Sequence, residues 1–203
     1  MKRLWVRNWR IRMTRALIAL LIVLFFISGS IWDQRYPAVA MALFVVGCIM
    51  ATLGVIGRLW CALYIGGYKT QNLITVGPYS ISRNPLYFFS FIGSVGAGLT
   101  SETLTIGVIL AIGFLLIYPK VILDEEARLR QVHGPLFDEY ARRTPRFFPR
   151  WSLLVEPEEY VTRPAIFRRH ALSAMWFIWI IVILEVIENL REMDLLKPLF
   201  NLY

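Results

Sequence analysis

The sequence predicts an all-α fold, a polytopic membrane helical bundle of about five transmembrane helices. The 203 residues are 57% hydrophobic and have a mean hydropathy of +0.56, which is too apolar for a soluble domain of this length. Because a spanning helix needs roughly 17–25 mostly apolar residues, long uncharged runs mark the spans. Five such runs are present: Ala16–Trp32, Tyr36–Gly57, Asn84–Ser101, Thr103–Pro119 and Ala171–Leu184. The fifth run is short and must recruit flanking residues to cross.

Short polar segments between these runs predict two helical hairpins and a polar extension. The loops of the hairpins are residues 33–37 and Thr100–Glu102. After the fourth run, the helical pattern continues through Asp124–Arg130, and His133-Gly134-Pro135 then breaks it. Leu136–Arg143 alternates apolar and charged residues in the manner of a short amphipathic helix. We treat the chain as a single integral membrane domain, 1–203, in three parts: an N-terminal anchor with two spans (1–57), a core (58–150), and a C-terminal linker with the fifth span (151–203).

The distribution of basic residues predicts the orientation in the membrane. The segment before the first span is basic, and so are the segments 58–84 and 120–169, whereas the remaining loops carry few lysines and arginines. The positive-inside rule then places these three segments, and the N-terminus with them, in the cytoplasm, as in a bacterial inner membrane. Since the arginines border spans, the net charge of +8 predicts contact with membrane lipids and no nucleic acid partner.

The cysteines, histidines and glycines form no recognisable metal or nucleotide motif. Cys48 and Cys61 lack a CxxC partner, and His133 and His170 stand alone, so we expect no metal. Gly93-x-x-Gly96-x-Gly98 superficially resembles a nucleotide loop, but it lies inside an apolar run with no preceding strand. We therefore expect a small-residue face that lets helices approach closely.

The segment Gly77-Pro78-Tyr79-Ser80-Ile81-Ser82-Arg83-Asn84-Pro85-Leu86-Tyr87 is a turn followed at once by a membrane helix. Asn84 is a favourable N-cap, and Pro85 fits the first helical turn. A helix start attracts anions, and the faces of Tyr79 and Tyr87 attract cations. A zwitterionic or sulfonium-bearing cofactor would suit such a mouth, although an interfacial turn with snorkelling Arg83 and tyrosines remains the alternative.

Charged residues near the predicted cytosolic surface supply two further candidate groups. Glu125 and Glu126 either bind ribose hydroxyls or an amino group, or simply end a helix with support from Arg130. Arg143 and Arg146 either fork around a carboxylate or phosphate, or act as positive-inside anchors. Because there is no Ser/His/Asp set, Walker loop or His/Glu array, any chemistry must use an organic cofactor.

Taken in order, these motifs resemble the superfamily of isoprenylcysteine carboxyl methyltransferases and phospholipid methyltransferases. The resemblance rests on Gly77-Pro78-Tyr79, Arg83-Asn84-Pro85-Leu86-Tyr87, Glu125-Glu126 and Tyr140 to Pro149, and it covers roughly residues 58–150. The commoner family turn has His at the position of Asn84. The resemblance implies an integral membrane enzyme that uses S-adenosyl-L-methionine in a cytosolic cofactor pocket.

The resemblance also implies roles for the matching residues. Tyr79, Arg83, Asn84, Pro85 and Tyr87 would form one wall of the cofactor pocket, and Glu125 and Glu126 would close its other side. Arg143 and Arg146 would lie near the reacting group or the cofactor lid.

The resemblance implies a lipidic or prenylated methyl acceptor, and we favour carboxylate O-methylation. Three alternatives remain open at this stage: a phospholipid amine N-methyltransferase, an NADPH-dependent membrane reductase related to sterol reductases, and a non-catalytic membrane scaffold.

Overall fold

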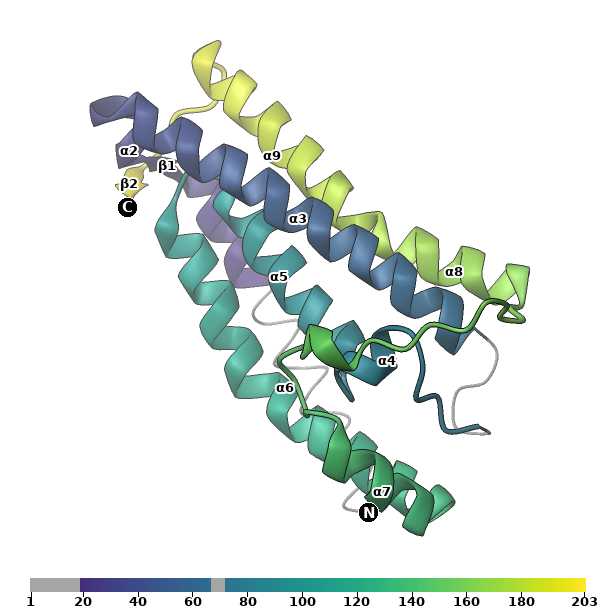
Figure 1. The fold of residues 1–203 in the computed structure, drawn as a ribbon. Coiled ribbons are helices and arrows are strands. Elements are labelled where there is room, and N and C mark those ends of the chain that lie inside the picture. The colour runs from purple at the N-terminus through teal and green to yellow at the C-terminus, as the bar shows by residue number, and fades with distance from the viewer. Residues whose placement is uncertain (1–18, 67–71) are drawn as a thin grey trace. The chain divides into compact units, whose positions relative to one another are not determined.

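The computed structural model describes residues 19–66 and 72–203, which are predominantly helical (Figure 1). Residues 19–27 form the first described helical segment. The helices that follow are α2 (Ile31–Arg35), α3 (Pro37–Ile65), α4 (Pro78–Ile81), α5 (Pro85–Leu99), α6 (Leu104–His133), α7 (Pro135–Arg143), α8 (Pro164–Ala174) and α9 (Trp176–Glu192). A short 3-10 turn, η1, covers Trp151–Leu153, and two short strands are β1 (Ser28–Ser30) and β2 (Phe200–Leu202).

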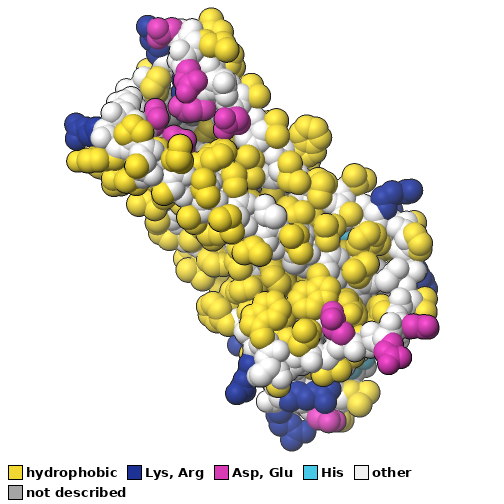
Figure 2. Space-filling view, turned by 45° about the horizontal axis from the view of Figure 1, so that its top comes forward, with side chains coloured by type: hydrophobic (Ala, Val, Ile, Leu, Met, Phe, Trp, Pro, Cys, Tyr) yellow, Lys and Arg dark blue, Asp and Glu magenta, His cyan; other side chains and the backbone are white. Residues whose placement is uncertain are grey.

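The apolar helices confirm an all-α membrane protein. Three stretches are long and apolar enough to cross a bilayer, namely α3, α6 and the combined α8 and α9, and α5 is a shorter apolar helix. Large apolar side chains cover much of the face shown in Figure 2. The fifth predicted run is longer than expected, because the helix begins at Pro164 and continues to Glu192. The first predicted run, Ala16–Trp32, is not one continuous helix: residues 19–27 are helical, Ser28–Ser30 form β1, and residues 16–18 lie outside the described part of the chain.

The predicted boundaries around α5, α6 and α7 agree with the structure, and one pair of strands was not predicted. Helix α5 ends at Leu99 and α6 begins at Leu104, on either side of the expected hairpin loop. Helix α6 continues through Pro119 and ends at His133, and α7 occupies the expected amphipathic segment. The strands β1 and β2 pair in parallel, with Ser28 opposite Phe200. Three-residue strands carry too little periodicity to be read from a sequence.

The chain divides into two compact units, and helices α3, α5 and α6 each contribute to both. Unit 1 contains residues up to 50, 94–117 and 178–203. Its core cluster is Phe25, Ile106 and Ile187. The Ser30 hydroxyl caps α2 by accepting from the amides of Trp32 and Asp33. Unit 1 thus joins the first described helix to the end of the chain through an apolar core and the strand pair.

Unit 2 contains residues 51–93 and 118–177. Here α3 and α5 lie in backbone contact, because a Cβ atom on Gly54 would lie 2.4 Å from the Cα atom of Gly93. This close approach confirms the expectation that the glycine-rich stretch is a packing face. A core cluster of Cys61, Tyr64, Tyr79 and Phe89 lies beside it. Unit 2 contains the candidate functional residues predicted from the sequence.

Candidate functional site

The turn before α5 depends on Gly77, whose backbone is left-handed with φ of 59°. A Cβ atom there would lie 2.3 Å from the ring of Tyr64, so only glycine fits both the angle and the space. The amide of Gly77 donates to the carbonyl of Val155 (2.7 Å), and the carbonyl of Gly77 accepts from the Ser80 hydroxyl (2.7 Å). These contacts fix the short helix α4 and direct Tyr79 inward.

The segment between α4 and α5 is tied to the loop that follows α7. The Arg83 amide donates to the carbonyl of Pro145 (2.8 Å), and the Ser82 hydroxyl donates to the carbonyl of Phe147 (3.0 Å). The Arg150 amide donates in turn to the carbonyl of Ile81 (2.9 Å). Two segments about sixty residues apart in sequence are therefore held in one fixed register.

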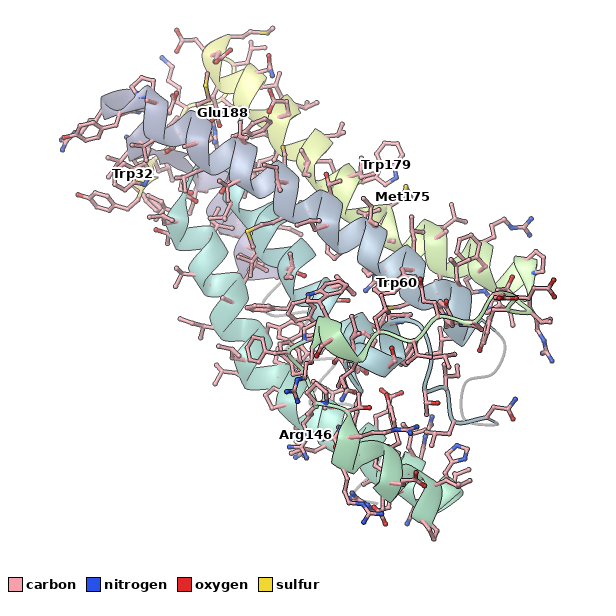
Figure 3. The ribbon with its side chains drawn as sticks, in the orientation of Figure 1. Trp32, Trp60, Arg146, Met175, Trp179 and Glu188 are labelled. Atoms are coloured by element: carbon pink, nitrogen blue, oxygen red, sulfur yellow. The ribbon has the colours of Figure 1, made fainter. Side chains whose placement is uncertain are left out.

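Glu126 is the buried centre of this arrangement, and its side chain is only 5% exposed. Its Oε1 atom lies 3.2 Å from Arg83 Nε and accepts a hydrogen bond from Asn84 Nδ2 at 3.0 Å. Its Oε2 atom lies 3.2 Å from Arg146 Nε, and the Arg146 side chain reaches back toward α6 (Figure 3). One carboxylate on α6 thus joins the turn before α5 to the loop after α7. We call these four residues, Glu126, Arg83, Asn84 and Arg146, the carboxylate clasp.

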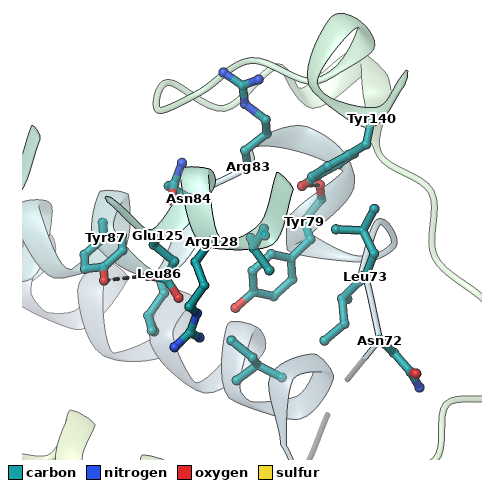
Figure 4. A pocket seen from close by; sticks show the side chains of 13 residues that line it. Asn72, Leu73, Tyr79, Arg83, Asn84, Leu86, Tyr87, Glu125, Arg128 and Tyr140 are labelled. Atoms are coloured by element: carbon teal, nitrogen blue, oxygen red, sulfur yellow. Dashed lines mark hydrogen bonds between the residues drawn. The ribbon is translucent and has the colours of Figure 1, made fainter. Parts of the chain in front are cut away.

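A pocket opens beside the clasp, between the turn, α6 and α7 (Figure 4). Its interior cavity is about 80 Å³, and it opens to solvent. Polar and charged side chains converge on it from several elements, which is typical of a ligand site. The lining residues are Ile65, Asn72, Leu73, Ile74, Tyr79, Arg83, Asn84, Leu86, Tyr87, Glu125, Arg128, Leu129 and Tyr140.

Tyr79 places an unsatisfied polar group in this pocket. Its ring points into the pocket in Figure 4, its side chain is buried, and its hydroxyl has no hydrogen-bond partner in the described part of the chain. The Tyr140 hydroxyl, in contrast, donates to the carbonyl of Tyr79 (2.7 Å). Burial raises the pKa of both phenols, so each remains protonated at neutral pH. An orphaned buried hydroxyl is costly unless a ligand satisfies it.

Tyr87 and Glu125 form the opposite wall. The Tyr87 hydroxyl donates to Glu125 Oε2 (2.8 Å), as the dashed line in Figure 4 shows. The ring of Tyr87 packs edge-on against Tyr118, with centroids 5.5 Å apart. Since both its hydroxyl and its ring are held by α6, Tyr87 presents an aromatic surface in a defined orientation.

The structure brings together most of the residues predicted from the sequence. Five line the pocket: Tyr79, Arg83, Asn84, Tyr87 and Glu125. Glu126 and Arg146 belong to the clasp behind it, and Pro85 is fully buried at the start of α5. Arg143 is exposed on α7 and does not line the pocket, although its charge acts on the Tyr140 phenol.

Asn84 has a different role from the predicted side-chain cap. Its backbone carbonyl accepts from the amides of Tyr87 and Phe88, the first-turn contacts of α5. Its side-chain amide nitrogen instead donates to Glu126 Oε1 and to the carbonyl of Arg146 (3.0 Å each). The amide therefore satisfies the buried carboxylate, which a sequence pattern with Asn before Pro does not reveal.

The sequence interpretation missed other residues of the pocket. Arg128 and Leu129 lie three and four positions after Glu125 and line the same pocket. This spacing places residues on one face of a helix, so both could have been predicted from the position of Glu125. Tyr140 comes from α7, and Leu73 comes from the chain before α4. Tyr140 begins the motif that runs to Pro149 but was assigned no role in the pocket, and no local pattern around Leu73 pointed to it.

Comparisons with known proteins give the family context. Residues 35–135 match the family described as phospholipid methyltransferase. The chain is 39% identical over 183 residues to the nickel-cobalt-cadmium resistance protein NccN of Alcaligenes xylosoxydans xylosoxydans, covering 90% of this chain and 84% of that protein. It is 37% identical over 194 residues to the cobalt-zinc-cadmium resistance protein CzcN of Cupriavidus metallidurans, covering 96% of this chain and 86% of that protein. No solved structure matches the chain.

Proposed function

Because the chain belongs to the phospholipid methyltransferase family of membrane proteins, we propose that it transfers a methyl group from S-adenosyl-L-methionine to a lipidic or prenylated acceptor. The observation that carries this proposal is the pocket of unit 2, which combines an orphaned phenol, an aromatic face, a carboxylate and an arginine. Carboxylate O-methylation is the favoured reaction, and N-methylation of a phospholipid amine is the alternative. The names of the two relatives concern metal resistance, and a role in metal resistance is the second candidate function for this chain.

Each chemical group of S-adenosyl-L-methionine has a suitable side chain in the pocket. The face of Tyr87 suits a sulfonium, and the free face of the Glu125 carboxylate suits a hydroxyl or amino group. Arg128 offers a cation for a carboxylate, and the Tyr79 hydroxyl offers the hydrogen bond that it lacks within the chain. When bound, the cofactor would supply an electrophilic methyl carbon on a cationic sulfur. Pro85 and Asn84 would act through the backbone that starts α5.

The chain's own contribution would be alignment and exclusion of water. The carboxylate clasp fixes the turn before α5 against α6, and Arg146 therefore has a positioning role through Glu126. Arg143, beside the Tyr140 phenol, is proposed to orient the acceptor at the mouth of the pocket. We place this pocket on the cytoplasmic side of a bacterial inner membrane, with a cytoplasmic N-terminus, because the basic segments 58–84 and 120–169 border it.

A metal-dependent reaction has less support from the residues. Among residues 19–66 and 72–203, no group of three or more histidine, cysteine, aspartate or glutamate side chains is arranged to hold a metal ion. The donors in the pocket are a carboxylate, phenols, an amide and guanidinium groups, which suit an organic zwitterion better than a cation.

Calorimetric titration of the protein in nanodiscs tests the proposal. S-adenosylhomocysteine should bind saturably, and Glu125→Gln should weaken its binding roughly ten- to hundredfold, because a charge-assisted hydrogen bond is lost. Glu139→Gln, an exposed change on α7, is the matched control and should leave the affinity unchanged. Binding of NADPH in place of S-adenosylhomocysteine would favour the reductase alternative. Heat from neither ligand would favour a non-catalytic scaffold.

A further inference from the structure

An open groove lies in unit 2 where α6 turns into α7, and it shares one residue, Arg83, with the pocket described above. We call it the α6–α7 groove. Three of its side chains are guanidinium groups and one is a carboxylate, so the groove carries a net positive charge. The lining residues are Arg83, Arg130, Pro135, Asp138, Ala141 and Arg142. The proposed methyl transfer gives no role to Arg130, Asp138 or Arg142.

The groove forms because the chain reverses sharply between α6 and α7. Gly134 adopts a left-handed φ of 53°, and its amide donates to the carbonyl of Arg130 at 2.9 Å. Pro135 then begins α7. This turn brings Arg130, in the last turn of α6, against Asp138, in the first turn of α7, with Nε and Oδ1 2.6 Å apart. One ion pair between half-exposed side chains therefore joins the two helices of the groove.

Arg83 enters the groove from the turn before α5 and is its most buried cation, since its side chain is only 11% exposed. Its Nε atom faces Glu126, and its Nη1 atom donates to the carbonyl of Ala141 at 3.1 Å. In Figure 4 its guanidinium group points away from the ring of Tyr79. Because a guanidinium group carries five N–H donors, these contacts leave Arg83 with donors for a further acceptor.

Arg142 is the cation of the groove that lacks a counter-charge. It is exposed in the last turn of α7, and it forms no hydrogen bond or ion pair with another residue in the described part of the chain. The carboxylate of the groove, Asp138, is already bonded to Arg130, and Glu126 of the clasp is shared between two arginines. The groove therefore has more cationic donors than the neighbouring carboxylates satisfy.

We propose that the α6–α7 groove binds the phosphate group of an anion from the cytoplasm, with Arg83, Arg130 and Arg142 as donors. Planar guanidinium groups match the oxygens of a phosphate in pairs, and here they come from three separate segments of the chain. The apolar lining residues, Pro135 and Ala141, offer little surface to an acyl chain, which favours a soluble anion over a lipid head group. This site is independent of methyl transfer.

Titration of the full chain in maltoside micelles with glycerol 3-phosphate, followed by phosphorus NMR, tests this site. The wild-type protein should bind saturably, and Arg142→Gln should weaken binding at least about tenfold, because a charge-assisted hydrogen bond is lost. Since Arg142 is exposed and bonded to no described residue, this variant should fold. Arg142→Lys should keep part of the affinity, because the charge remains without the planar fork. Arg168→Gln, an exposed change of the same charge on α8, should bind as the wild type does.

A second titration, with phosphatidic acid in the micelles, identifies the source of the phosphate group. Phosphatidic acid carries the same phosphomonoester on a lipid. Unchanged affinity for glycerol 3-phosphate supports the site with a soluble anion as its ligand. Competition by phosphatidic acid that Arg142→Gln abolishes supports the same site with a lipid head group as its ligand.

Measurements with S-adenosylhomocysteine separate this proposal from the proposed function. Its affinity should change less than about twofold in Arg142→Gln, because Arg142 does not line the pocket. Saturating S-adenosylhomocysteine should leave glycerol 3-phosphate bound to the wild type. Absence of saturable binding of glycerol 3-phosphate overturns the proposal, and so does equal binding by wild type and Arg142→Gln. Complete displacement by S-adenosylhomocysteine also overturns it, because the phosphate would then occupy the pocket.

Discussion

The two compact units of this chain use buried polar groups in different ways. The core of unit 1 is a cluster of Phe25, Ile106 and Ile187, and its Arg191–Glu188 pair joins residues three positions apart on one helix. Unit 2 buries Glu126 against two arginines from distant segments, and its Tyr79 hydroxyl has no partner among the residues that the structure describes. Local ion pairs add little to a fold, whereas long-range buried ones fix segments relative to one another. The difference is therefore one of range: the buried charges of unit 2 hold distant segments together beside a pocket, whereas the ion pair of unit 1 is local.

The largest expected effect comes from removing the centre of the carboxylate clasp. Glu126→Leu should destabilise the protein by about 3 kcal/mol, because it leaves Arg83 without its buried counter-charge and the Asn84 amide without its acceptor. Thermal unfolding in detergent, followed by circular dichroism, measures this change. Glu188→Gln in unit 1 is the comparison and should cost less than about 1 kcal/mol, since its pair is local and partly exposed. Equal losses from the two variants would contradict the contrast between the units.

A smaller change in the free energy of unfolding, in the stabilising direction, is expected when Tyr79 is replaced. Tyr79→Phe removes a buried hydroxyl that has no partner, so the ligand-free protein should become about 1 kcal/mol more stable. Affinity for S-adenosylhomocysteine should fall at the same time by roughly tenfold. Tyr140→Phe is the matched control: its hydroxyl is bonded to the Tyr79 carbonyl, so this change should lower stability. A loss of stability in Tyr79→Phe would show that the hydroxyl is satisfied within the chain.

The smallest expected effect concerns Glu102 in the α5–α6 loop of unit 1. Burial, followed by the nearby Asp33, Glu188, Glu185 and Glu192 carboxylates, raises the pKa of Glu102 to about 7. The folded state therefore binds a proton more tightly than the unfolded state, and the ionised carboxylate opposes folding. This cost is absent below the ordinary carboxyl pKa near 4.5, grows as the pH rises to 7, and is constant above it.

Glu102→Gln tests this pH dependence. The variant should be more stable than wild type at pH 8, by less than about 1 kcal/mol because the side chain is partly exposed. The advantage should disappear by pH 4, and unfolding curves at several pH values measure it. Glu139→Gln on the exposed face of α7 should show no such trend. A stability difference that is independent of pH would exclude Glu102 as the source.

Much of this fold could be read from the sequence, because hydrophobic runs and breakers are local signals. The run Tyr36–Gly57 and its extension correspond to α3, and His133-Gly134-Pro135 separates α6 from α7. The β1–β2 pair could not be read, because it joins three-residue segments about 170 positions apart. The start of the last membrane helix was also missed, because Arg168 and Arg169 interrupt the apolar pattern without interrupting the helix.

The sequence predicted most of the residues of the candidate site, but not the contacts that their side chains make. Tyr79, Tyr87 and Glu125 could be assigned to one pocket because their motifs resemble those of a family. That Glu126 faces away into a clasp, while its neighbour Glu125 lines the pocket, follows from a rotation of about 100° between adjacent helical residues. The direction of that rotation depends on which face of α6 packs inward. Arg58 was assigned to the basic segment after the second span, whereas it lies within α3 and donates to Ser90 and Ser173 on other helices.

The membership of the two units also sets an order of assembly during synthesis. Every residue of unit 2 has been made by position 177, whereas unit 1 needs β2, Ile187 and the Tyr203 carbonyl that accepts from Thr105. The nascent chain can therefore form the carboxylate clasp before β2 and Ile187, which contact residues 19–30, have been synthesised. During that interval the amides and carbonyls of β1 and the apolar side of Phe25 must be shielded by lipid or by the insertion machinery. A chain that stops before residue 200 would contain every residue of the unit 2 pocket but would lack β2 and therefore the strand pair of unit 1.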